Sequence, residues 1–114
     1  MSYGAIPTVG IDDIPDPLPP DLHVLDVREP VEWQHGHIEG ASHIPLAELP
    51  RRLADLPEDR RLLVVCKVGA RSARAVAYLG ANGRDAVNLD GGMIDWASTG
   101  RPMTSETGHD PHVV

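Results

Sequence analysis

The sequence predicts an α/β fold built on a mainly parallel sheet. Apolar runs of strand length alternate with segments of helical spacing along the 114 residues. The strongest run, residues 61–66, is nearly all apolar, which is typical of a parallel strand covered on both faces. The clearest helical pattern covers residues 71–81, where small and apolar residues recur on one face. A chain of this length has room for one hydrophobic core, and therefore for one domain.

The other elements follow from local patterns. Residues 1–21 are expected to hold an edge strand within 6–11 and then a proline-rich connector, because proline is tolerated at the start of an edge strand. Pro30 suits the first turn of a short helix that runs through Gln34 and ends at Gly36. The domain then spans 22–103, with strands at 22–27, 41–44 and 86–89, helical segments at 46–53 (interrupted at Pro50) and 93–98, and a flexible polar tail at 104–114.

Composition excludes several classes of function. Seventeen acidic residues against ten basic ones give a formal charge of −7, which disfavours binding to nucleic acid or to anionic membranes. Cys66 is the single cysteine, so neither an intramolecular disulfide nor a four-cysteine zinc site is possible. No apolar run approaches the roughly 18 residues of a membrane-spanning helix, and the first residues lack the pattern of a signal peptide. A free thiol without an export signal predicts a cytoplasmic protein.

Cys66 is the candidate reactive residue because of what surrounds it. It ends the most apolar strand and precedes a glycine-bearing loop and a helix, and ligands bind at that edge of open α/β sheets. Loop N–H groups and the positive end of the helix favour an anion there, as do Lys67, Arg71 and Arg74. Such surroundings lower a thiol pKa from about 8.5 to roughly 3.5–7.5. A lone cysteine is also typical of a small core residue, but this combination favours a nucleophile that attacks an anion.

Phosphate-loop and metal chemistry fit the sequence poorly. The residues after Cys66 lack the Gly-Lys-Ser/Thr of a nucleotide-binding P-loop. His35 and His37 are too few to hold a metal without carboxylate partners. We therefore expect no metal and no organic cofactor.

Three sequence blocks resemble one known family. The block Cys66-Lys67-Val68-Gly69-Ala70-Arg71-Ser72 resembles the active loop of single-domain rhodaneses, whose pattern is Cys-x-x-Gly-x-Arg-Ser. The other two blocks, in the family's order, are Asp26-Val27-Arg28-Glu29 with Gly36-His37-Ile38, and Leu89-Asp90-Gly91-Gly92 with Gly100-Arg101-Pro102. The resemblance covers roughly residues 22–103. It implies a rhodanese-like three-layer fold, in which helices flank a mainly parallel five-stranded sheet.

The resemblance also implies an enzyme of the thiosulfate sulfurtransferase type. In such enzymes the thiolate takes the outer sulfur of thiosulfate or a related donor as a persulfide, and passes it to cyanide or a thiol. Cys66 would then be the nucleophile and sulfur carrier. The active loop, defined as residues 66–72, would bind the donor and stabilise the persulfide through Lys67, Val68, Gly69, Ala70, Arg71 and Ser72. With no second cysteine in the chain, a sulfur relay needs an external thiol or a partner protein as donor or acceptor.

The roles of Arg28, Lys67 and Arg71 stay open at this point. Lys67 either binds the donor or is a solvated residue of the loop. Arg28 either faces the anion or, with Asp26, pairs with loop or helix charges and supports the site. Arg71 either contacts the donor or fixes the loop by pairing with Glu29 or Glu32.

Two other functions compete with sulfur transfer. A phosphatase or arsenate reductase would use the same nucleophile, but relatives with those activities carry a loop one residue longer. The six residues from Cys66 to Arg71 therefore favour sulfur over phosphorus. A non-catalytic or carrier module that serves a partner protein is the other alternative, although such binding modules often lack the cysteine.

Overall fold

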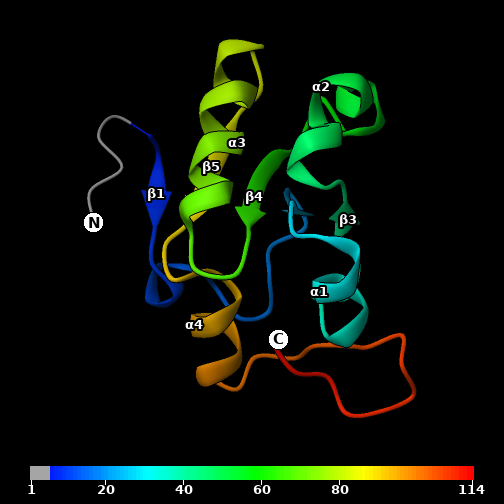
Figure 1. Ribbon diagram of the computed structural model, residues 1–114. Helices are drawn as coiled ribbons and strands as arrows, with labels where there is room; N and C mark the ends of the chain where they lie inside the picture. Colours follow the sequence, from blue (N-terminus) through cyan, green and yellow to red (C-terminus); the bar gives the residue numbers. More distant parts are fainter. Residues whose placement is uncertain (1–5) are drawn as a thin grey trace.

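The computed structural model describes residues 6–114 and contains one five-stranded parallel sheet in the order β1-β5-β4-β2-β3 (Figure 1). The predicted α/β class and parallel sheet are confirmed. The strands are β1 (Thr8–Val9), β2 (Leu22–Asp26), β3 (Ser42–His43), β4 (Arg61–Val65) and β5 (Ala86–Leu89). The helices are α1 (Pro30–His35), α2 (Leu49–Arg52), α3 (Ala70–Ala81) and α4 (Gly92–Ser98), with 3-10 helices at Ile11–Asp13, Leu46–Glu48 and Leu53–Asp55.

The N-terminal strand differs in detail from the expectation, and the segment 46–53 agrees with it. β1 is shorter than the expected 6–11, because a 3-10 helix begins at Ile11 within what was expected to be extended chain and connector. Residues 1–5 of the expected N-terminal segment 1–21 lie outside the described residues. The segment 46–53 is divided as predicted, with Pro50 in the first turn of α2, where its missing N–H removes no helical hydrogen bond.

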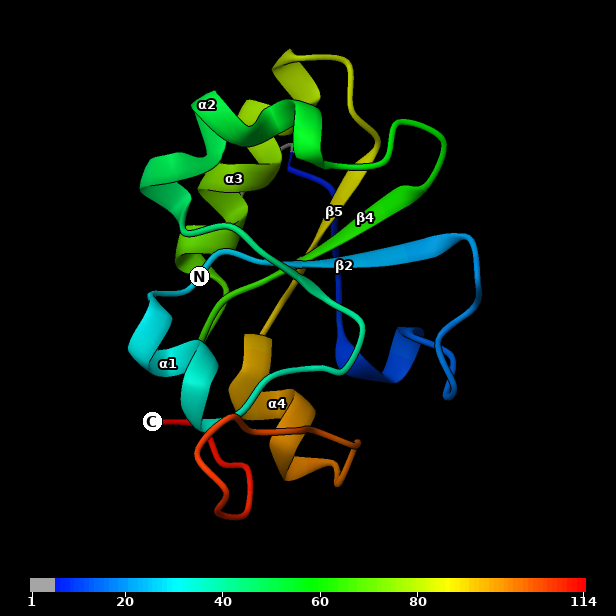
Figure 2. The same cartoon turned by 90° about the vertical axis from the view of Figure 1, so that its right-hand side faces the viewer.

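Alternation along the central strand divides the core into two layers. Leu62 and Val64 of β4 pack, together with Cys66, beneath α2 and α3. Leu63 and Val65 point to the opposite face, against α4 and the 3-10 helix that begins at Ile11. Figure 2 shows α2 and α3 on one side of the strands and α4 on the other. Both faces of β4 are therefore covered, which explains why its sequence is an unbroken apolar run.

The order of the strands determines where a site can form. β2 and β4 are hydrogen-bonded neighbours, but the chain leaves β2 toward β3 and leaves β4 toward β5, on the other side. The connections from two adjacent parallel strands thus diverge at their carboxyl ends, which is the topological switch point where ligands bind in open α/β sheets. Asp26 ends β2 and Cys66 follows β4 at this point.

The C-terminal segment 104–114, expected to be a flexible tail, has a defined path along α1. His37 and Thr104 exchange two backbone hydrogen bonds, of 2.9 and 2.8 Å. Farther along, the N–H of His112 donates to the carbonyl of His35 at 2.9 Å. Gly36 lies at the centre of this contact, where an added Cβ would meet the His112 carbonyl oxygen at 2.5 Å and the Met103 methyl at 2.6 Å.

Replacing Gly36 with alanine should therefore loosen the C-terminal segment. The added methyl overlaps backbone and side chain, so we expect a loss of about 1–3 kcal/mol in the free energy of unfolding. The matched control is Gly80→Ala in α3, where the new Cβ meets open space and alanine should add about 0.5–1 kcal/mol. Denaturant unfolding of both variants measures this. Equal stabilisation by both substitutions would show that the segment is not held against Gly36.

Candidate active site

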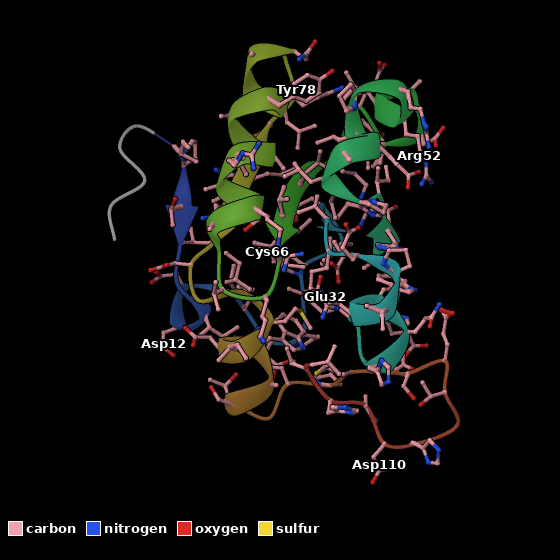
Figure 3. The ribbon with its side chains drawn as sticks, in the orientation of Figure 1. Asp12, Glu32, Arg52, Cys66, Tyr78 and Asp110 are labelled. Atoms are coloured by element: carbon pink, nitrogen blue, oxygen red, sulfur yellow. The ribbon has the colours of Figure 1, made fainter. Side chains whose placement is uncertain are left out.

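Cys66 follows the carboxyl end of the central strand and is the first residue of the active loop. Cys66 is only 1% exposed to solvent. The loop turns at Gly69, which has a φ of 113° and serves as the N-cap of α3. That left-handed backbone favours glycine, which explains the residue type at this position. Figure 3 shows Cys66 beside the start of α3, with Glu32 of α1 close by.

The loop replaces solvent around the sulfur with hydrogen-bond donors. The N–H of Gly69 donates to Cys66 Sγ at 3.1 Å, and the hydroxyl oxygen of Ser72 lies 3.3 Å from Sγ. Burial raises the pKa of the Cys66 thiol, but hydrogen bonds from the side chain and N–H of Ser72 and from the N–H groups of Gly69 and Val68 outweigh it. The pKa therefore lies below its ordinary value. Chemically, this sulfur is suited to act as a thiolate nucleophile.

The start of α4 supports the loop from below. Met93 donates its N–H to the carbonyl of Cys66 at 2.8 Å, and Ile94 donates to the carbonyl of Lys67 at 3.1 Å. This close approach requires Gly92, because a Cβ there would overlap the Cys66 carbonyl oxygen. The loop backbone is thus anchored on its carbonyl side, while its N–H groups remain directed at the sulfur.

The outer loop residues face solvent. Val68 is 54% exposed, Ala70 is exposed and Lys67 is partly exposed. Within the predicted active loop, Cys66 and Ser72 are therefore buried, whereas Lys67 is partly exposed.

Arg71 of α3 forms a bidentate ion pair with Glu32 of α1. Its two terminal nitrogens donate to the two carboxylate oxygens at 2.7 and 2.9 Å. The hydrogen bond from Arg71 holds the pKa of the Glu32 carboxyl below its ordinary value, and the bond to Glu32 raises the pKa of Arg71. Of the two sequence-based alternatives, this geometry matches the one in which Arg71 fixes the loop by pairing with Glu32.

Asp26 and Arg28 form a second ion pair, which is fully buried. Arg28 Nη2 donates to Asp26 Oδ2 at 2.7 Å and also to the carbonyl of Gly36 at 2.7 Å. Both side chains are at most 1% exposed. The pair thus fastens the end of β2 to the end of α1, which is the geometry expected of supporting residues rather than of a residue open to a soluble donor.

Sequence reasoning did not single out Asn88. It lies in β5, is fully buried, and its Oδ1 accepts a hydrogen bond of 2.5 Å from the Ser72 hydroxyl. A signal for it exists in the sequence, because Asn88 is the one polar residue in the four-residue strand β5. A buried amide among apolar neighbours needs hydrogen-bond partners, and so points to a polar group across the interior.

A cavity of about 490 Å³ opens beside the loop. One face of α3 contributes Arg71, Arg74 and Tyr78 to its wall, and Val27 and Leu49 form part of its apolar floor. Val27 and Leu49 pack in the same core cluster as Cys66. The cavity is therefore lined in part by the same core cluster that contains Cys66.

The described part of the chain contains neither a metal-binding cluster nor a membrane-spanning helix. Within residues 6–114, His, Cys, Asp and Glu side chains form no group of three that is placed to hold a metal ion. No helix in that range has the length and apolar character needed to cross a membrane.

Comparison with known proteins gives a consistent family assignment. The model of the rhodanese-like domain matches residues 13–99. A sulfurtransferase of Allochromatium vinosum is 39% identical over 89 residues, covering 77% of this chain and 83% of the relative. The crystal structure of a rhodanese-related protein from Thermoplasma volcanium has a TM-score of 0.71 and 38% identity, and covers 74% of this chain and 84% of that one.

One relative is a much longer protein. MoeZ of Mycobacterium tuberculosis, whose name describes an adenylyltransferase/sulfurtransferase, is 46% identical over 84 residues, which are 71% of this chain but 21% of the relative. The chain thus spans about a fifth of that relative's length. Because the family model covers most of the sequence and the fold and active loop agree with it, the chain belongs to the rhodanese-like domain family.

Proposed function

We propose that this protein is a thiosulfate sulfurtransferase that works through a persulfide on Cys66. The observation that carries the proposal is the sulfur at the switch point of the sheet, where the N–H of Gly69 and the hydroxyl of Ser72 contact it. Membership of the rhodanese-like family and the sulfurtransferase names of relatives support sulfur transfer as the general activity.

The proposed cycle has two displacements at sulfur. The Cys66 thiolate attacks the outer sulfur of thiosulfate, an S–S bond forms to Cys66, and the S–S bond of the donor breaks as sulfite leaves with its electron pair. Cyanide or a thiolate then attacks the outer sulfur of the persulfide. Thiocyanate or a new persulfide leaves, and the Cys66 thiolate is restored. No external oxidant or reductant is consumed.

The loop residues have distinct proposed roles. Amides of the loop stabilise the negative charge on the attacking sulfur and on the persulfide. Lys67, a partly exposed cation next to Cys66 in the loop, attracts the dianionic donor. Arg71, through Glu32, keeps α1 against the loop, and the buried pair of Asp26 and Arg28 supports the end of β2.

Two alternatives remain as outcomes of experiment. A phosphatase or arsenate reductase is disfavoured by the six-residue loop, and hydrolysis of an aryl phosphate would indicate it. A carrier module that serves a partner protein is compatible with the match to MoeZ, where the similar segment is 21% of a longer protein. Such a module would take sulfur from a protein persulfide and not from thiosulfate. A free thiol at the site fits a reducing compartment, and we propose the cytoplasm.

Intact-mass measurement tests the persulfide directly. After thiosulfate, the wild-type protein should gain the mass of one sulfur atom on Cys66, and cyanide should remove it with release of thiocyanate. Cys66→Ser should fold but gain nothing, because its hydroxyl is nearly the same size and is not a comparable nucleophile. Sulfur gain by Cys66→Ser would contradict the mechanism, and no gain by the wild type would favour the carrier alternative.

Removing the charge of Lys67 should weaken the use of thiosulfate. We expect Lys67→Ala to raise the KM for thiosulfate severalfold while leaving the cyanide step unchanged, because only the first step brings a dianion to the loop. Arg51→Ala is the matched control, since Arg51 is a well-exposed cation in α2 and not part of the active loop. Steady-state kinetics with each substrate varied makes the measurement. If both variants keep the wild-type KM, Lys67 is only loop surface.

The reactivity of Cys66 should persist at lower pH than that of an ordinary thiol. The site lowers the pKa of Cys66, so the thiolate forms at a lower pH in the folded protein. Alkylation by iodoacetamide should then slow only as the pH falls through that lowered pKa, because protonation removes the nucleophile. A peptide of residues 61–69 supplies the reference thiol. An inflection at or above that of the peptide would contradict the assigned hydrogen-bond environment.

A further inference from the structure

Three buried polar groups form a row that leads from the end of β4, through α3, to β5. Cys66 Sγ is 3.3 Å from Ser72 Oγ, and Ser72 Oγ is 2.5 Å from Asn88 Oδ1. The groups come from the end of β4, the first turn of α3 and the middle of β5. Ser72 and Asn88 are both fully buried. The other end of the Asn88 amide, Nδ2, is buried without a hydrogen-bond partner among residues 6–114.

The available hydrogens allow the hydrogen bonds along this row to point in either of two directions. A serine hydroxyl has one hydrogen to donate. While Ser72 donates to Asn88 Oδ1, its oxygen is free to accept from the thiol S–H, and the row runs from sulfur to amide. Once Cys66 ionises, its sulfur has no hydrogen and needs a donor. The Ser72 hydroxyl can stabilise that charge only by turning its hydrogen away from Asn88.

Asn88 has the chemistry to reverse the row. A half-turn of its side-chain amide exchanges Oδ1 and Nδ2. Nδ2 then donates to Ser72 Oγ, and Ser72 donates to the sulfur anion. The turn gives Nδ2 the hydrogen bond to Ser72 and moves Oδ1 to the buried position that Nδ2 occupied without a partner. Aspartate or leucine would lack this reversible donor and acceptor pair.

We propose that Asn88 is a positioning residue that directs the Ser72 hydroxyl toward the ionised sulfur of Cys66. This proposal rests on the proposed function in one respect, namely that the ionised sulfur is the attacking group. Asn88 touches neither donor nor acceptor. It acts through Ser72 and favours the thiolate by donating to the hydroxyl oxygen, because each hydrogen bond in a chain polarises the next.

We call the hydrogen-bonded row from Asn88 through Ser72 to Cys66 the relay. A double-mutant cycle with Asn88→Leu and Ser72→Ala tests it. The pKa of Cys66 is measured for the four proteins from the pH dependence of iodoacetamide alkylation. Asn88→Leu should raise the pKa by about half a pH unit. In the Ser72→Ala background the same change should have no effect, because the hydroxyl that transmits it is absent. The neighbouring charges of Lys67, Arg71, Asp26 and Arg28 are the same in all four proteins, so their contributions cancel.

Three results would overturn the proposal. The first is an unchanged pKa in Asn88→Leu. The second is a lower pKa, which would mean that Asn88 holds the Ser72 hydrogen away from the sulfur. The third is an equal shift with and without Ser72, which would mark a general packing effect. Asn82→Leu, the same change at an exposed asparagine that ends α3, should leave the pKa at the wild-type value.

A second measurement needs no variant at position 88 and holds even if Asn88→Leu fails to fold. The side-chain amide of Asn88 is followed by NMR in the isotope-labelled wild type. Its signal should move as the pH crosses the pKa of Cys66, and should stay fixed in Cys66→Ser. A signal that stays fixed in the wild type, or that moves equally in both proteins, would refute the relay. Both experiments follow the ionisation of the Cys66 thiol and do not measure sulfur transfer. A negative result would therefore contradict the role of Asn88 without contradicting the proposed enzyme activity.

Discussion

The candidate active site depends on one constraint: a charged sulfur that is buried must be surrounded by hydrogen-bond donors. At 1% exposure, Cys66 has little water to stabilise a thiolate, and desolvation alone would hold it as a neutral thiol. Short contacts from the Gly69 N–H and the Ser72 hydroxyl take the place of that water. The Gly69 N–H is already oriented before the charge forms, whereas the Ser72 hydroxyl hydrogen points to Asn88 and has to turn toward the sulfur.

Holding those donors in place explains much of the surrounding structure. The loop has to turn sharply at Gly69, and it has to stay turned while α3 begins. The first turn of α4 binds the loop's carbonyl oxygens, and Gly92 permits that approach because it has no Cβ. From the other side, Arg71 reaches Glu32 and closes the gap to α1. Residues that never contact the sulfur thus determine whether its donors point inward.

The sequence predicted the parts of this arrangement that are local, and missed those that depend on distant segments. The run 61–66, the glycine turn and the start of α3 follow from neighbouring residues, so the position of Cys66 could be predicted. Arg71 and Glu32 lie 39 positions apart, and nothing local decides between Glu29 and Glu32 as the partner. Asn88 shows the same problem, since its contact with Ser72 depends on the register of β5 against β4.

The C-terminal segment extends the same dependence to the end of the chain. Polar residues with no apolar periodicity predict a tail, yet backbone hydrogen bonds at Thr104 and His112 hold this one to the α1 end of the domain. Gly36 joins the two systems, because its carbonyl accepts from buried Arg28 while its Cα faces His112. α1 is therefore fixed at its C-terminal end by the ion pair of β2 and by the tail. Its first turn carries Glu32, the partner of Arg71, so one short helix connects the C-terminal segment to the active loop.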